Sequence, residues 1–243
     1  MATLKEQAVS MVQNISMKTV CDVQHFCGFP KEFLDFLFSL QFNNTIDLLS
    51  ENKAIYKQLI SEPLHMLFNE LAKTAILVSE TLIIKPSKCV STMYNDMRFS
   101  RTTPLKGYMY IRFREPSDKD ILGLYFDMGC EYYSYGIRIY KQTSAGMERI
   151  RESAVEKSPK FIQELEKLNL LDMKIIGDKF VKDHYTEIKN EILKDFLNRK
   201  NFYIGRNCPV GESVFNGQMQ NEIASAFIEL KDMYELLKKS LMP

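Results

Sequence analysis

Hydrophobic and polar positions follow three different rhythms along the chain. Up to about residue 80, apolar residues recur every three or four positions, as in Phe33–Leu40 and Leu64–Ile76, which is the spacing of amphipathic helices. From about residue 82 to 140 the period falls to two, as expected for strands that bury one face. From about residue 143 to 240 the helical spacing returns. The pattern predicts a central sheet between two helical segments.

The central segment contains three strand-like runs, Tyr108–Arg114, Leu122–Asp127 and Tyr132–Tyr140. Each is rich in aromatic or β-branched residues, and Met128–Glu131 between the second and third has the composition of a hairpin turn. No helical pattern long enough for a parallel crossover separates the runs. We therefore expect an antiparallel meander.

Local signals mark several boundaries of the helices. Asn44 is expected to cap a helix, and Ser158-Pro159 has the composition of a helix start. The last helix is predicted from about Asn216 to Lys239, and Phe202–Ile204 is predicted to add an edge strand. No repeat, low-complexity tract or linker interrupts the chain. The prediction is a single α+β domain over residues 1–243, with a central antiparallel sheet flanked by N-terminal and C-terminal helices.

Composition narrows the classes of function without selecting one. The 32 basic and 31 acidic side chains leave a net charge of +1, so no bulk field favours nucleic acid or an anionic membrane. Five scattered cysteines and three histidines form no disulfide framework and no metal-binding pattern. The sequence contains no signal-peptide or membrane-spanning pattern, and no motif for nucleotide cofactors, catalytic serines or zinc. We expect a soluble cytoplasmic protein without metal or cofactor, and the sequence indicates no oligomeric state.

The segment Met93–Lys106 reads M-Y-N-D-M-R-F-S-R-T-T-P-L-K. It resembles the R-F-S-K/R-D-K-S/T-P-Y-K signature of the family called "domain of unknown function 2461". Phe42–Asn44, Tyr135–Ile137, Gly177–Phe180 and Leu197–Phe202 resemble further landmarks of that family and occur in the same order. The resemblance covers about residues 30–240 and implies one continuous domain. Because the family has no established activity, the resemblance implies no reaction.

The same segment holds the best candidate for a functional site. Arg98, Arg101 and Lys106 gather around a Ser-Arg-Thr-Thr-Pro turn, and Asp96 precedes them. Such a turn can present backbone N–H groups, hydroxyls and guanidinium groups to one anion. The pattern predicts a site for a small anionic or phosphorylated ligand. The alternative is that Arg98 pairs with Asp96 or with a helix carboxylate and only holds the loop in place.

Two further features are open to more than one interpretation. Gly177-Asp178-Lys179 can bring Asp178 and Lys179 into the same anion site, although a charged turn is the commoner meaning of such a tripeptide. Arginines and tyrosines also crowd the predicted strands, where such a face can stack bases or sugars. Tyrosines on a half-buried sheet are more often part of the core and its rim. The residues concerned are Arg112, Arg114, Arg138, Tyr108, Tyr110, Tyr125, Tyr132, Tyr133, Tyr135 and Tyr140.

Three hypotheses about function remain open from the sequence. In the first, the basic cluster binds a small anionic ligand. In the second, the protein is an enzyme in which the same cluster stabilises negative charge and Asp96, Asp178 or His184 moves a proton. In the third, the protein has a structural or protein-interaction role and no small-molecule site.

Overall fold

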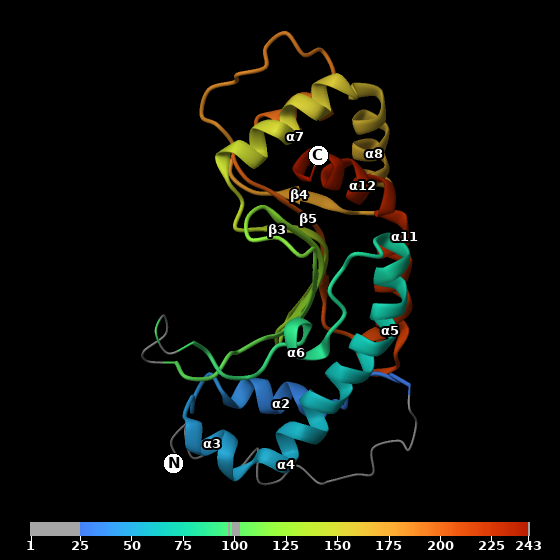
Figure 1. Ribbon diagram of the computed structural model, residues 1–243. Coiled ribbons are helices and arrows are strands. Elements are labelled where there is room, and N and C mark those ends of the chain that lie inside the picture. The colour runs from blue at the N-terminus through green and yellow to red at the C-terminus, as the bar shows by residue number, and fades with distance from the viewer. Residues whose placement is uncertain (1–24, 97, 99–102, 243) are drawn as a thin grey trace.

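The computed structural model describes residues 25–96, 98 and 103–242. In this part of the chain, five antiparallel strands form one sheet in the order β1-β2-β3-β5-β4, and helices precede and follow it (Figure 1). The predicted α+β class with a central antiparallel sheet is confirmed. The strands are β1 (Met109–Arg114), β2 (Ile121–Met128), β3 (Tyr132–Tyr140), β4 (Lys174–Ile176) and β5 (Tyr203–Pro209).

The first three strands form the expected meander. The turn between β2 and β3 is closed by a hydrogen bond from Gly129 N to Tyr132 O (3.0 Å). The predicted position of the strand around Phe202–Ile204 was wrong, because β5 lies inside the sheet between β3 and β4. The edge beyond it is occupied by β4, whose three residues are too few to produce a recognisable period of two.

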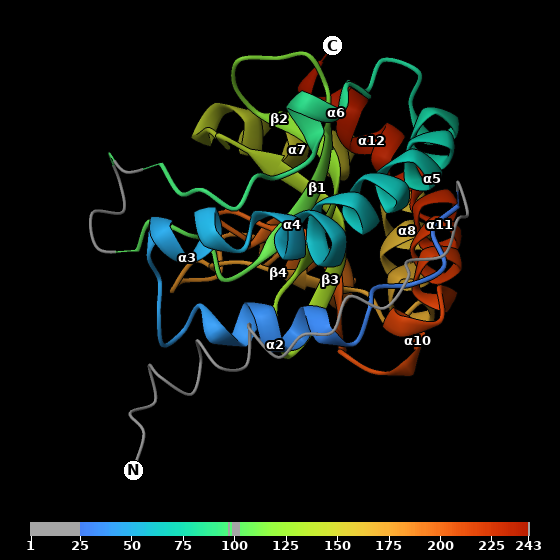
Figure 2. The ribbon, with the colours of Figure 1, turned by 90° about the horizontal axis from the view of Figure 1, so that it is seen from below.

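The N-terminal helices gather at one end of the strands, where Figure 2 shows α2, α3 and α4 together. A π-helical turn, η1, comes directly before α5, where Pro63 lacks the N–H group that would continue regular bonding. The predicted helix cap at Asn44 was wrong, since the hydroxyl of Thr45 accepts from Leu48 N (3.3 Å) instead. These elements are α2 (Glu32–Ser39), α3 (Ile46–Glu51), α4 (Lys53–Tyr56), η1 (Lys57–Ser61), α5 (Glu62–Val78) and α6 (Pro86–Cys89).

The predicted last helix is in fact two helices that meet at Leu230. The change of direction lets α11 pack beside α5 and β3 while α12 packs beside α7 and α8, a division that periodicity cannot show (Figure 1). None of the described helices is both long and apolar enough to cross a lipid bilayer. The C-terminal helices are α7 (Ser144–Glu156), α8 (Ser158–Leu170), α9 (Glu191–Leu197), α10 (Glu212–Phe215), α11 (Gln218–Glu229) and α12 (Lys231–Leu241).

The two faces of the sheet differ in chemistry. Met109, Ile111 and Phe113 of β1 point to the core, on the convex side of the sheet where α5 and α11 lie (Figure 1). The alternate positions point to the concave side, away from these helices, and many of them are arginine, tyrosine or aspartate. We call six of these residues the Arg–Tyr face: Tyr110, Arg112, Asp127, Arg138, Tyr140 and Tyr203.

Candidate functional site

The predicted loop site begins with an ion pair. Arg98 Nη2 lies 2.6 Å from Asp96 Oδ2, and Arg98 N donates to Asp96 Oδ1 (3.1 Å). Both residues are exposed, and the hydrogen bonds from Arg98 hold the pKa of Asp96 below its usual value. Arg101 lies outside the described residues. The interpretation of Arg98 as a partner of Asp96 therefore fits, and ligand binding by this loop stays a prediction.

The base of the loop is held by Asn44. Its Oδ1 accepts from Leu105 N (2.8 Å) and its Nδ2 donates to Leu105 O (2.9 Å), so the amide mimics a neighbouring strand. Lys106 N donates to Met93 O (2.7 Å) beside this contact. Two segments that resemble family landmarks, Phe42–Asn44 and Met93–Lys106, are thus joined by hydrogen bonds. The asparagine contributes here by anchoring the loop rather than by capping a helix.

Asn44→Ala should lower the free energy of unfolding by about 1–3 kcal/mol, because the part-buried N–H group of Leu105 loses its partner and the Leu105 carbonyl keeps the donor Asn95 Nδ2 (3.1 Å) but loses Asn44 Nδ2. Amide hydrogen exchange of the segment around Leu105 should become faster. Asn43→Ala is the matched control, since among the described residues its side chain accepts one long hydrogen bond, from the hydroxyl of Thr45 (3.4 Å). Equal exchange rates at Leu105 in Asn44→Ala and Asn43→Ala would contradict the anchoring role.

Lys106 connects the loop to the Arg–Tyr face. Its Nζ donates to Thr92 O (2.7 Å) and Tyr94 O (2.5 Å) and lies 5.7 Å from the centre of the Tyr110 ring. Burial, together with the nearby charge of Arg112, lowers the pKa of this ammonium group. Among the cations that the sequence predicts for the anion site, Lys106 thus lies at the rim of the Arg–Tyr face.

Asp178 and Lys179 belong to a different region. Asp178 Oδ2 accepts from Asn201 Nδ2 (2.9 Å), and Lys179 forms an ion pair with Asp195. Figure 1 shows the segment that follows β4 well apart from the segment that leads into β1. Asp178 and Lys179 therefore do not lie beside Arg98 and Lys106. Their contacts fit the interpretation of this tripeptide as a charged turn. His184 is equally separate, with its ring 4.7 Å from the ring of Phe180.

Guanidinium groups and phenol rings alternate across the Arg–Tyr face. The Cζ atom of Arg112 lies 3.7 Å from the centre of the Tyr110 ring and 5.3 Å from that of Tyr140. The Cζ atom of Arg138 lies 5.7 Å from the Tyr140 ring and 5.3 Å from the Tyr203 ring. Stacking of this kind stabilises the cations and leaves the in-plane N–H groups of a guanidinium directed outward.

Asp127 lies between the two arginines. Its carboxylate oxygens are 3.8 Å from Arg112 Nη2 and 3.7 Å from Arg138 Nη1, which is beyond hydrogen-bond length. The side chains are 25%, 23% and 40% exposed, in the order Asp127, Arg112, Arg138. Burial raises the pKa of Asp127, and the two guanidinium charges oppose this shift only in part. The three charges are therefore close to one another but loosely paired.

One tyrosine and two glycines lie beneath the Arg–Tyr face, on the floor of the concave side. Tyr125, Gly136 and Gly205 are aligned across β2, β3 and β5. The Tyr125 hydroxyl lies so close to Gly205 that a Cβ atom there would be 2.1 Å from it. The hydroxyl also hydrogen-bonds with Ser134 Oγ (2.9 Å). Tyr125 is thereby buried at the floor of the concave side, and its burial raises its pKa.

Several polar atoms of the face are buried without partners. Within the described residues, Arg112 Nε, Asp127 Oδ1 and Tyr140 Oη have neither solvent contact nor a hydrogen-bond partner. Such atoms are rare in folded proteins because each one costs free energy. Three of them in one cluster single out this face as the strongest candidate site among the described residues. Sequence reasoning placed Arg112 and Arg138 beside a face that can stack bases or sugars and interpreted Tyr140 as part of the core and its rim, and it missed Asp127.

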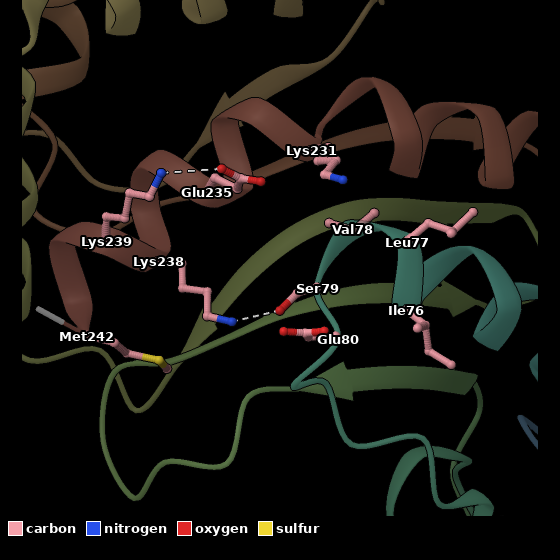
Figure 3. Close-up of a pocket in the computed structure, with 10 residues that line it drawn as sticks. All are labelled: Ile76, Leu77, Val78, Ser79, Glu80, Lys231, Glu235, Lys238, Lys239 and Met242. Atoms are coloured by element: carbon pink, nitrogen blue, oxygen red, sulfur yellow. Dashed lines mark hydrogen bonds and ion pairs between the residues drawn. The ribbon is translucent and has the colours of Figure 1, made fainter.

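A cavity of about 440 Å³ lies elsewhere, between the end of α5 and α12 (Figure 3). Two of the three ammonium groups that line it have protein acceptors: Lys239 pairs with Glu235 (3.4 Å), and Lys238 donates to Ser79 Oγ (2.7 Å). Lys238 also pairs with Glu115 (3.0 Å). Because most of its positive charge is compensated in this way, this cavity is a weaker candidate than the Arg–Tyr face.

The comparison with protein families confirms the resemblance seen in the sequence. The family described as "Conserved hypothetical protein (DUF2461)" matches residues 32–236, and the chain therefore belongs to this family. No curated protein matches the chain. The description of the family states no activity, so a functional conclusion has to rest on the geometry of the site.

Proposed function

We propose that the protein binds a small anionic or phosphorylated ligand on the concave side of its sheet. Arg112 and Arg138 are the residues that contact the anion, and Lys106 lies at the rim. The observation that carries this proposal is that the two guanidinium groups are stacked but only loosely paired with a carboxylate. They are held by phenol rings but lie 3.7–3.8 Å from Asp127, too far for a hydrogen bond. Planar donors held in this way suit a carboxylate or phosphate group.

The local charge supports an anion rather than a cation. Lys106, Arg112 and Arg138 contribute three positive charges against the carboxylate of Asp127, although the whole chain is nearly neutral. A concentration of one sign on a concave, partly desolvated surface strengthens the attraction for the opposite sign. Arg98 and Arg101 belong to the segment that leads into Lys106. We assign to them the attraction of the approaching anion rather than direct contact.

The proposed location is the cytoplasm. The described cysteines, Cys27, Cys89, Cys130 and Cys208, carry free thiols. Free thiols are typical of a reducing compartment, where phosphorylated and carboxylated metabolites are available as ligands.

Arg112→Ala and Arg138→Ala should each weaken binding of inorganic phosphate at least about tenfold, because a charge-assisted hydrogen bond contributes about 1.5–3 kcal/mol. Isothermal titration calorimetry at low ionic strength measures the effect. Arg206→Ala is the matched control: its side chain is 40% exposed, like that of Arg138, but it pairs with Asp172 and points to the other face.

Two results would contradict the proposal. One is unchanged phosphate affinity in both Arg112→Ala and Arg138→Ala. The other is an equal loss in Arg206→Ala, which would indicate a general effect of net charge rather than a site on the Arg–Tyr face. Circular dichroism of each variant checks that the sheet is retained.

A further inference from the structure

Asp127 lies between the two guanidinium groups that the proposed function assigns to the anion. Its contacts with Arg112 and Arg138 are long, 3.8 and 3.7 Å, and its Oδ1 atom has no hydrogen-bond partner among the described residues. A carboxylate is an unexpected residue at the centre of an anion site, because it repels the ligand. Binding of a simple anion therefore does not explain why Asp127 lies between the two arginines.

Binding of an anion changes the surroundings of Asp127. Oδ1 and Arg112 Nε are shielded by neighbouring side chains, so a ligand reaches them only if a guanidinium group turns toward it. An arginine that forms a bidentate contact with the ligand gives up its long contact with Asp127. If both arginines do so, a carboxylate that is only 25% exposed is left without a compensating charge, which is costly.

The neighbouring side chains of the protein can hardly replace the two arginines as partners of Asp127. Ser134 faces Asp127 across the β2–β3 ladder, but its hydroxyl is already hydrogen-bonded to Tyr125 (2.9 Å). On the other side, Tyr110 is the register partner of Asp127, and its ring is stacked against Arg112. The Tyr140 hydroxyl of the same face also lacks a partner among the described residues, but it does not donate to Asp127 in this arrangement, so a donor from the ligand can satisfy Oδ1.

We infer that the ligand carries a hydrogen-bond donor, a hydroxyl or an ammonium group, beside its anionic group, and that Asp127 accepts from this donor. This inference rests on the proposed function. The ligand would carry its anionic group and its hydrogen-bond donor a few ångströms apart. Simple anions are therefore excluded as the natural ligand. Hydroxylated organic phosphates and amino acids share this chemistry, and the tyrosine rings on both sides of the arginines suit their carbon skeletons.

Matched pairs of probes test the inference by calorimetry. Glycerol 3-phosphate and propyl phosphate have the same number of carbon atoms and differ in the hydroxyl groups, while alanine and propionate differ in the ammonium group. We expect the donor-bearing member of at least one pair to bind about tenfold or more tightly than its partner. In Asp127→Ala this ratio should fall to about 1. Asp127→Asn should keep most of the preference if the donor is a hydroxyl and lose it if the donor is an ammonium.

The outcomes separate this inference from the proposed function. If propyl phosphate or propionate binds in an Arg112-dependent way and neither donor-bearing probe binds more tightly, the anion site stands and the donor inference is overturned. If none of the four probes binds to the wild-type protein, the donor inference is overturned, and the proposed function is overturned with it if inorganic phosphate also fails to bind. The comparison in the wild-type protein decides the matter even if Asp127→Ala fails to fold.

Discussion

Glu115→Ala is expected to lower the free energy of unfolding by about 3–5 kcal/mol, the range found when one partner of a buried ion pair is removed. The Glu115 side chain is 1% exposed and pairs with Lys238 (3.0 Å), which is 28% exposed. Its carboxylate also accepts from Ser79 Oγ (2.7 Å), Thr81 Oγ1 (2.5 Å) and Tyr234 Oη (3.1 Å). The substitution would leave a partly buried ammonium group and three hydroxyls without this acceptor.

The effect is large because the network joins three parts of the fold. Ser79 follows α5, Glu115 follows β1, and Tyr234 and Lys238 belong to α12. Urea denaturation at pH 7 measures the loss. Glu235→Ala is the control on the same side of α12, since its ion pair with Lys239 is exposed and contributes about 1 kcal/mol or less. Equal losses in the two variants would show that the buried network does not hold these elements together.

The stabilisation from Glu115 should depend on pH in a defined direction. Burial favours a higher pKa, but hydrogen bonds from Thr81, Ser79 and Lys238 outweigh it and hold the pKa of Glu115 below its usual value. A carboxyl group whose pKa is lowered by folding stabilises the protein above its unfolded pKa, about 4.3, and this contribution is lost as the pH falls through the folded pKa. The stability gap between the wild-type protein and Glu115→Gln should therefore narrow below about pH 4.

Gly136→Ala is expected to destabilise the protein by about 3 kcal/mol or more, or to prevent folding. Gly136 has φ +151°, and a Cβ atom there would lie 2.1 Å from Ile204 O in the adjacent strand β5. An alanine would therefore combine backbone strain with a clash between two central strands. Relief of the clash requires β3 and β5 to separate, which breaks the ladder beneath Tyr125.

Gly211→Ala provides a control for the general cost of replacing glycine. A Cβ atom at this position would meet no heavy atom of the described residues within 4 Å, and the φ of −155° is ordinary extended backbone. Its unfolding free energy should stay within about 1 kcal/mol of that of the wild-type protein. Similar urea midpoints for the two alanine variants would contradict the close packing of β3 against β5.

Much of the fold could be predicted because periodicity reports which face of a local segment is buried. The strands Met109–Arg114, Ile121–Met128 and Tyr132–Tyr140 lie within two residues of their predicted bounds. The neighbours of a strand depend on distant segments, so the internal position of β5 was not predictable from its own residues. The division of the last helix at Leu230 is likewise a result of packing against two different partners.

The candidate site was predictable only in part. Lys106 and the arginines of β1 and β3 stand out in the sequence by their charge. Asp127 does not, because it is a single acidic residue at the end of the apolar run Ile121–Phe126. Its importance appears only when the ladder aligns it with Tyr110 and Ser134 and brings the arginines to both sides.

The anion site proposed on the Arg–Tyr face can be tested directly with a heavy-atom oxyanion. Crystals of the wild-type protein soaked in tungstate would be used to calculate an anomalous difference map. We expect the strongest peak within hydrogen-bond distance of the guanidinium groups of Arg112 and Arg138, with Lys106 at its edge. A peak beside Arg98 or in the cavity between α5 and α12, with none on the concave side of the sheet, would contradict the proposed site.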